Sequence, residues 1–460
     1  TAVNDNCVIT PAGEWLLDNF YLIEEQIRTA KRHLPKGYSR ELPRLSQGPS
    51  AGRPRVYDIA LEAVAHGDGR VDGETLTRFV AAYQCVTPLK LGELWAIPIM
   101  LRLAVIENLR RVAVQVAAGW VERNMASSWA DKMSDTAEND AKSLILVIAE
   151  MAHSNPPMVS AFVAELARRL KGRGPALALP LTWIEQRLVE SGLTIEQLVQ
   201  SENQQQAADQ VSISNSIGSL RILGAMDWRE FVEGLSVVEQ TLRSDPGGVY
   251  GQMDFATRDR YRHATEKLAR QGCLSEPEIA GWAVELARGG NAERNSHVGY
   301  FLVGKGLPEL EKGAQVRHSL SEALCRTASR HPLFIYLGAV VLLTAMIGGG
   351  FWSQASAFGA PDWASLAIAL LGLLAGSQLA VALVNWLATL LVSAHPLPRM
   401  DFSEGIPASE RTLVVVPTML TSASGIEDLA EALEVRFLAN RDPNLYFALL
   451  TDFGDANQET

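Results

Sequence analysis

Two uncharged stretches near the C-terminal end decide the fold: LFIYLGAVVLLTAMIGGGFW, from Leu333 to Trp352, and SLAIALLGLLAGSQLAVALVNWLATLLVSAHPL, from Ser365 to Leu397. Neither stretch contains Asp, Glu, Lys or Arg, and His395 is the only titratable side chain in the second. A helix needs about 20 apolar residues to cross the hydrocarbon core of a bilayer, which is about 30 Å thick. The two stretches therefore predict a pair of transmembrane helices, residues 333–397, joined by a short loop at 353–362.

Positive charges flank this predicted pair on both sides. Arg317, Arg326 and Arg330 precede the first stretch, and Arg399 follows the second. Positive residues close to membrane helices favour the cytoplasmic side. We therefore expect both long flanks to lie in the cytoplasm and the loop to lie on the outer side.

Residues 1–330 are predicted to form a large helical region. Thr10 and Pro11 mark a helix start, because a hydroxyl can cap the helix and proline suits its first turn. Further capping boxes, with a hydroxyl three residues before an acid or amide, are predicted at Thr182/Glu185, Thr194/Gln197 and Ser275/Glu278. Apolar stripes at helical spacing are expected at Leu16/Phe20/Ile23/Ile27 and at Ile279/Trp282/Leu286.

One segment of this region, Leu94 to Ile106, is apolar enough to be mistaken for a third membrane span. Arg102 interrupts it, and the segment is too short to cross a bilayer. We expect a buried core helix here.

The pattern changes after Arg411. Thr412 to Pro417 is a short β-branched run typical of a buried parallel strand, residues 427–438 read as a helix, and Leu445 to Leu450 reads as a second strand. Together they predict one βαβ unit. Since two strands do not make a stable sheet, we expect the rest of the sheet beyond Thr460.

Three residues are candidate ligand contacts of this unit. Ligands of open α/β sheets bind beyond the carboxyl ends of the strands. Pro417 and Thr418 follow the first predicted strand, and Asp452 follows the second. Asp452 could accept hydrogen bonds from the base or sugar of a nucleotide, or could simply cap the next turn.

Composition excludes several classes of function. The formal net charge of −11, with no basic stripe, argues against nucleic-acid binding. The four cysteines are isolated, and no histidine has a metal-binding partner at helical spacing, so no metal site is predicted. A denser cluster of acids, arginines and aromatics, Asp227 to Arg262, fits either a sugar or phosphate site or salt-bridged helix faces around a turn.

Several blocks of the sequence resemble the bacterial cyclic β-1,2-glucan synthases. The resemblance is carried by WLLDNFY at 15–21, LPKGY at 34–38, NSIGSLR at 215–221, RDRYR at 258–262, HVGY at 297–300, and residues 413–420 with 451–453. It extends through essentially the whole chain.

This resemblance implies that the chain is the N-terminal part of a much larger, multi-pass enzyme of the bacterial inner membrane. Such an enzyme would polymerise glucose from UDP-glucose into β-1,2-glucan, which downstream modules would then cyclise. The chain is expected to be mainly α, with a large helical region, a transmembrane helical hairpin and then the start of an α/β domain. The resemblance implies that this last part begins a GT-A type glycosyltransferase domain, in which Pro417, Thr418 and Asp452 begin to hold the uridine. Catalytic residues and the ligands of a divalent metal, Mg or Mn, are expected beyond Thr460. The alternative function is a membrane-anchored helical scaffold without catalysis of its own.

Overall fold

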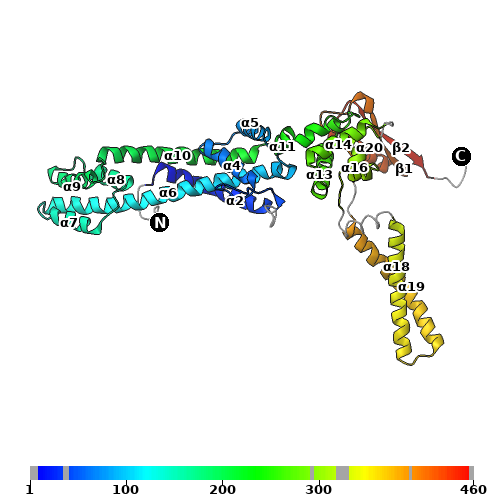
Figure 1. Cartoon of the computed structure of the whole chain (residues 1–460). Coiled ribbons are helices and arrows are strands. Elements are labelled where there is room, and N and C mark those ends of the chain that lie inside the picture. The colour runs from blue at the N-terminus through cyan, green and yellow to red at the C-terminus, as the bar shows by residue number, and fades with distance from the viewer. Residues whose placement is uncertain (1–8, 35–40, 291–294, 318–330, 393–395, 455–460) are drawn as a thin grey trace. The chain divides into compact units, whose positions relative to one another are not determined.

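The computed structural model describes residues 9–34, 41–290, 295–317, 331–392 and 396–454 (Figure 1). The chain divides into two compact units, Thr1–Gln240 and Thr241–Thr460. Helices dominate the described residues, which confirms the predicted fold class. Predictions that concern 35–38, Arg326, Arg330 and His395 fall outside the described residues.

The first unit is built from helices. They are α1 (Pro11–Asp18), α2 (Phe20–His33), α4 (Arg55–His66), α5 (Gly73–Gln84), α6 (Leu91–Asn139), α7 (Leu144–Ser154), α8 (Ser160–Leu170), α9 (Ala178–Val189), α10 (Ile195–Ala225) and α11 (Trp228–Leu235). The two long helices, α6 and α10, lie side by side, and the shorter helices pack around them (Figure 1).

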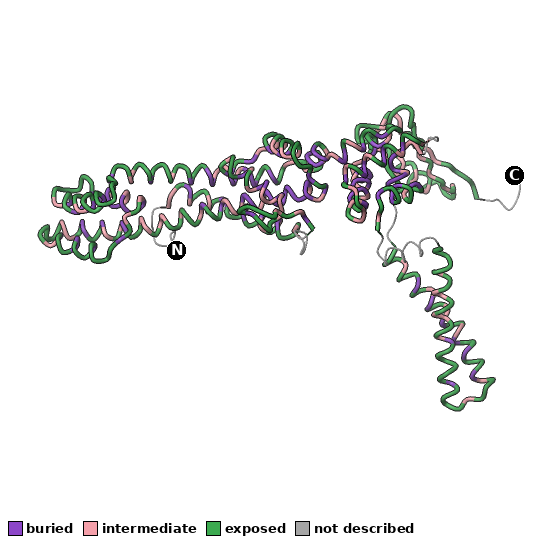
Figure 2. Tube along the Cα trace, viewed as in Figure 1, coloured by how far each residue is buried: buried purple, intermediate pink, exposed green. Residues whose placement is uncertain are grey.

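Helix α6 takes part in two separate hydrophobic cores. It has 49 residues, which corresponds to about 74 Å at a rise of 1.5 Å per residue. Its part from Leu91 to Val112 packs with α2, α4, α5 and the end of α10, whereas Ala126, Ala130 and Met133 pack with α7, α8 and α9. Buried segments therefore recur at both ends of the helix pair (Figure 2). The prediction of a buried core helix at Leu94 to Ile106 is confirmed.

The capping predictions are confirmed at three of four sites. The Thr10 hydroxyl accepts from the backbone N–H of Gly13, and Thr194 and Ser275 form capping boxes. The prediction at Thr182 is wrong, because α9 begins earlier, at Ala178, after a 3₁₀ turn. Thr182 therefore lies inside the helix, where its hydroxyl donates to the carbonyl oxygen of Ala178 at 3.1 Å.

Two predicted apolar stripes need correction. Asn19 separates α1 from α2, because its side-chain amide donates to the carbonyl oxygen of Trp15 and competes with the helix, and this leaves Phe20 56% exposed. On α14, Ile279 is buried as predicted, but Trp282 is 44% exposed, and three alanines and Val284 complete the buried apolar face. The indole of Trp282 instead covers Gly313, where an added Cβ would lie 2.4 Å from Nε1.

The second unit contains a helical part, two long apolar helices and a small sheet. Its elements are α13 (Phe255–Gln271), α14 (Glu276–Arg288), α15 (Val298–Leu302), α16 (Leu307–Gly313), α18 (Pro332–Ala357), α19 (Asp362–Leu391), β1 (Thr412–Leu420), α20 (Ala423–Ala439) and β2 (Leu445–Phe453); α12 (Val237–Leu242) crosses the boundary between the units. The three-part domain division inferred from the sequence stays a prediction.

Helices α18 and α19 form an antiparallel hairpin, and both are long and apolar enough to cross a membrane. The first helix continues to Ala357 rather than ending at Trp352, because neither glycine nor proline follows Trp352 before Gly359, where φ is +76°. The buried positions of α19 are mostly small and recur every three or four residues: Ser365, Ala369, Gly372, Gly376, Ala380 and Val384. Small residues let membrane helices approach closely.

The chain that follows α19 is tied to the start of α13. Met253 and Met400 form an antiparallel bridge. The N–H of Asp254 donates to the carbonyl oxygen of Arg399 at 2.9 Å, and the N–H of Asp401 donates to the carbonyl oxygen of Gln252 at 2.8 Å. Residues 396–401 are thereby fixed to the helical part of this unit.

Candidate functional site

The predicted βαβ unit is present, but its strands are longer than expected. β1 and β2 pair in parallel, and each extends three residues beyond its predicted end, to Leu420 and Phe453. Pro417 therefore lies inside a strand. This is possible because β1 pairs on one side only, so that the missing N–H of proline need not break a ladder hydrogen bond.

The register separates the three predicted ligand contacts. Thr418 pairs with Thr451, and Met419 pairs with Asp452. Because successive side chains of a strand alternate between faces, Asp452 shares its face with Pro417, whereas Thr418 belongs to the opposite face. The face of Thr418 is the one that α20 covers, since Phe437 of α20 contacts Phe447.

Asp452 is exposed near the carboxyl end of β2. Its carboxylate accepts a hydrogen bond from the backbone N–H of Phe453 at 2.8 Å, which leaves further acceptor positions open to solvent. Neither strand nor α20 contains a buried residue, and Leu413, Leu450 and Met419 are each more than half exposed. The apolar face beside Asp452 is thus uncovered.

A second candidate site lies in the first unit, between its two cores. An open cavity of about 840 Å³ is lined by α6, α8, α10 and the residues that lead into α1. A smaller cavity of about 230 Å³ shares Arg123 and Glu202 with it. Between them lies a polar layer, which we define as Arg123, Glu202, Gln206 and Asp209; the first three line both cavities, and Asp209 lines the smaller one.

Arg123 and Glu202 form the centre of this polar layer. Their side chains are 16% and 8% exposed, and Nη1 of Arg123 lies 2.8 Å from Oε1 of Glu202. Glu202 also accepts from the Ser160 hydroxyl at 3.0 Å and from the Gln206 amide at 2.8 Å. Burial raises the pKa of the nearby Asp209 carboxyl, a shift that the hydrogen bond from Gln205 opposes.

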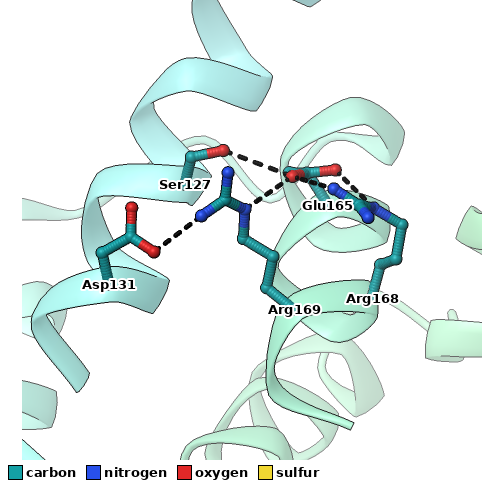
Figure 3. A network of polar contacts seen from close by, with 5 residues as sticks. All are labelled: Ser127, Asp131, Glu165, Arg168 and Arg169. Carbon is teal, nitrogen blue, oxygen red and sulfur yellow. Dashed lines mark hydrogen bonds and ion pairs between the residues drawn. The ribbon is translucent and has the colours of Figure 1, made fainter. Parts of the chain in front are cut away.

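A charged network forms one wall of the larger cavity (Figure 3). Arg168 donates to both carboxylate oxygens of Glu165, at 2.6 and 2.9 Å, and Arg169 bridges Glu165 at 2.9 Å and Asp131 of α6 at 2.6 Å. Burial works to raise the pKa of the Glu165 carboxyl, but hydrogen bonds from the two arginines outweigh it and lower that pKa. Ser127 adds a further donor to Glu165 at 3.3 Å.

Sequence reasoning did not predict this cavity. Its arginines and carboxylates come from three helices that are distant in the sequence, so no local motif joins them. One signal was available: the run Asn203-Gln204-Gln205-Gln206 interrupts the apolar face of α10 between its two cores.

The side chains of the cluster from Asp227 to Arg262 have mainly structural roles. Asp227 caps α11 by accepting from the N–H groups of Arg229 and Glu230, in the first unit. In the second unit, Tyr250 and Tyr261 are 0% and 1% exposed, so neither aromatic face is open to a sugar.

Two acids of the second unit, Asp245 and Asp259, lie buried or half-buried in the same part of the chain. Asp259 contacts Arg262 at 3.1 Å and His263 at 3.4 Å. Asp245, whose side chain is 1% exposed, accepts from Nδ1 of His297 at 2.9 Å and from three backbone N–H groups. Burial works to raise the pKa of Asp245, but these hydrogen bonds outweigh it and lower that pKa. Both acids therefore hold helices and turns together.

Comparison with known proteins bears on the whole chain. No protein-family model matches it. The chain is 34% identical over 458 residues to the cyclic beta-(1,2)-glucan synthase NdvB of Rhizobium meliloti (strain 1021). The resemblance to the cyclic β-1,2-glucan synthases is confirmed. The similarity covers 98% of this chain but 16% of NdvB. It therefore includes the helical units, the hairpin and the βαβ unit together.

Proposed function

We propose that this chain acts as part of a membrane-bound glucosyltransferase that uses UDP-glucose to build β-1,2-glucan. The observation that supports this most is the similarity to NdvB over 98% of the chain. The parallel β1–α20–β2 unit adds support, because strand ends of open α/β sheets are where nucleotides bind. Cyclisation of the glucan would require modules that the similarity does not reach.

In this proposal Asp452 contacts the UDP part of the donor. Its exposed carboxylate lies near the carboxyl end of β2 and uses one acceptor position on Phe453. Pro417 lies on the same face and would border the base, whereas Thr418 lies on the face toward α20 and would act through the backbone.

The family also implies a divalent metal. Among the described residues no group of three or more histidine, cysteine, aspartate or glutamate side chains is placed to hold a metal ion. These residues therefore do not fit the metal, and no step of the proposal runs through it.

Replacing Asp452 by alanine in the complete enzyme tests the donor site. If the bound donor covers Asp452, loss of this acceptor costs about 1–3 kcal/mol, which corresponds to donor binding weakened by roughly ten- to a hundredfold. Asp428→Ala on the exposed face of α20 is the matched control and should bind UDP-glucose normally. Titration of UDP-glucose measures both; normal affinity in the Asp452 variant would contradict the donor role.

We further propose that the hairpin of α18 and α19 spans the bacterial inner membrane with both flanks in the cytoplasm. A cysteine at Phe358, which is 89% exposed between the two helices, should react with an impermeant thiol reagent added from outside. A cysteine at Ser403 should react only from the cytoplasmic side. All four native cysteines, Cys7, Cys85, Cys273 and Cys325, would first be replaced by serine. The opposite pattern would reverse the topology.

A further inference from the structure

The larger cavity of the first unit has the size and chemistry of a ligand site. Its volume of about 840 Å³ lies within the range of typical small-molecule pockets, roughly 300–1,000 Å³. It is bounded by side chains that other contacts already hold in place, such as Glu202 with its three donors and Arg169 with its two carboxylates. A ligand would therefore meet a wall that is largely organised in advance.

The charges of this wall argue against an anionic ligand. Each of its three arginines already contacts a carboxylate: Arg123 with Glu202, Arg168 with Glu165, and Arg169 with Glu165 and Asp131. Three arginines face three acids, so the wall has no excess positive charge. A phosphate or carboxylate would meet no net positive charge at this wall and would be repelled by its carboxylates.

The remaining groups suit a neutral ligand that is rich in hydroxyls. Carboxylate oxygens accept hydrogen bonds, while Asn203, Gln206 and Ser128 carry amide and hydroxyl groups on the cavity lining. Trp120 also lines the cavity, and its Nε1 is buried without a hydrogen-bond partner among the described residues. Because solvent does not reach this nitrogen, Trp120 would meet a ligand through its ring, which supplies apolar contact area, rather than through this donor.

We propose that this cavity binds a neutral oligosaccharide. Trp120 would be a central contact, and the amides and carboxylates would form hydrogen bonds with the hydroxyls of the sugar. Taken with the proposed function, on which the choice of sugar rests, the ligand is a segment of β-1,2-glucan. The site lies in the helical region and is separate in sequence from the donor contacts at Asp452.

Titration calorimetry on the complete chain in detergent micelles tests this proposal, with linear β-1,2-gluco-oligosaccharides as the probe. We expect saturable binding of one oligosaccharide per chain. Trp120→Ala should weaken it at least tenfold. Ser128→Trp should also abolish it, because this exposed cavity residue would fill the space without removing any ion pair.

Trp282→Ala is the matched control, since Trp282 lies in the other unit and is 44% exposed; it should bind as the unchanged chain does. Absence of saturable binding, or binding that Trp120→Ala and Ser128→Trp leave unaltered, would overturn the proposal. Tighter binding of inorganic phosphate than of oligosaccharide at this cavity would also overturn it. Calorimetry needs no glucosyl transfer, so a failed Asp452 prediction leaves this test intact. Failure of oligosaccharide binding would likewise leave the test of UDP-glucose binding at Asp452 intact.

Discussion

The ion pair between Arg55 and Glu93 offers a sharp test of how the first core is held together. Arg55 opens α4, and Glu93 lies in the first turn of α6. Nε and Nη2 of Arg55 lie 2.6 and 2.7 Å from the two oxygens of Glu93. The Glu93 side chain is fully buried, whereas that of Arg55 is 15% exposed. The hydrogen bond to Glu93 is also the main reason that the pKa of Arg55 is raised.

Arg55→Ala should therefore be strongly destabilising. It removes both charge-assisted hydrogen bonds and leaves a buried carboxylate with the backbone N–H of Lys90, at 3.0 Å, as its remaining partner. Breaking a buried pair in this way costs about 3–5 kcal/mol. At 1.4 kcal/mol per tenfold change, local opening of α4 should become roughly 150- to 4,000-fold more frequent.

Amide hydrogen exchange, followed by mass spectrometry on peptides of α4 and the start of α6, measures this local opening. Arg28→Ala is the matched control, because Arg28 and Glu24 form an exposed pair with side chains 74% and 51% exposed. Such a pair contributes about 0–1 kcal/mol. Replacing Arg55 and Glu93 together by methionine should recover most of the loss. Equal exchange in the Arg28 and Arg55 variants would refute the reasoning.

Four further outcomes are expected. Hydrogen bonds to two carboxylates raise the pKa of His263 to about 9, so its protonation stabilises the fold fully below its unfolded pKa of about 6.5. This contribution is lost as the pH rises through 9, and His263→Gln should flatten the fall in melting temperature over that window. Asp245→Ala should lower the melting temperature at neutral pH, with a smaller difference from the unchanged chain in acid, since the pKa of Asp245 is lowered. Gly376→Leu should separate α18 from α19, because an added Cβ would lie 2.7 Å from Ile347, whereas Gly349→Leu meets nothing within 4 Å; proximity labelling between the helices distinguishes them. Residues 411–460 alone should show no cooperative melt by circular dichroism, because two strands leave most of their apolar surface bare.

Much of the fold could be predicted because composition alone specifies it. A long uncharged run needs no partner to be recognised, and the alternation from a β-branched run to a helix and back predicted the βαβ unit. The boundaries were less accurate where the deciding contact is tertiary. Pro417 continues its strand because β1 has a free edge, and Trp282 is half exposed because Gly313 gives its indole a surface to cover.

The two candidate sites also differ in whether local sequence or tertiary packing creates them. Asp452 could be found because strand ends are local features of the sequence. The cavity could not be found, because Arg123, Glu165 and Glu202 meet only after three helices have packed. Its polar residues looked like ordinary solvent-facing positions of amphipathic helices.

The arrangement of two cores along one unbroken helix has a consequence for cooperativity. The cores share α6 and α10 but are separated by the polar layer, so few apolar contacts couple them. Each core should then open with its own free energy, and the continuous backbones of α6 and α10 would be the main links between them. A molecule seated in the cavity would touch both long helices and α8 at this junction. Its contacts would stabilise both cores together, so the two unfolding transitions would merge into one as it binds.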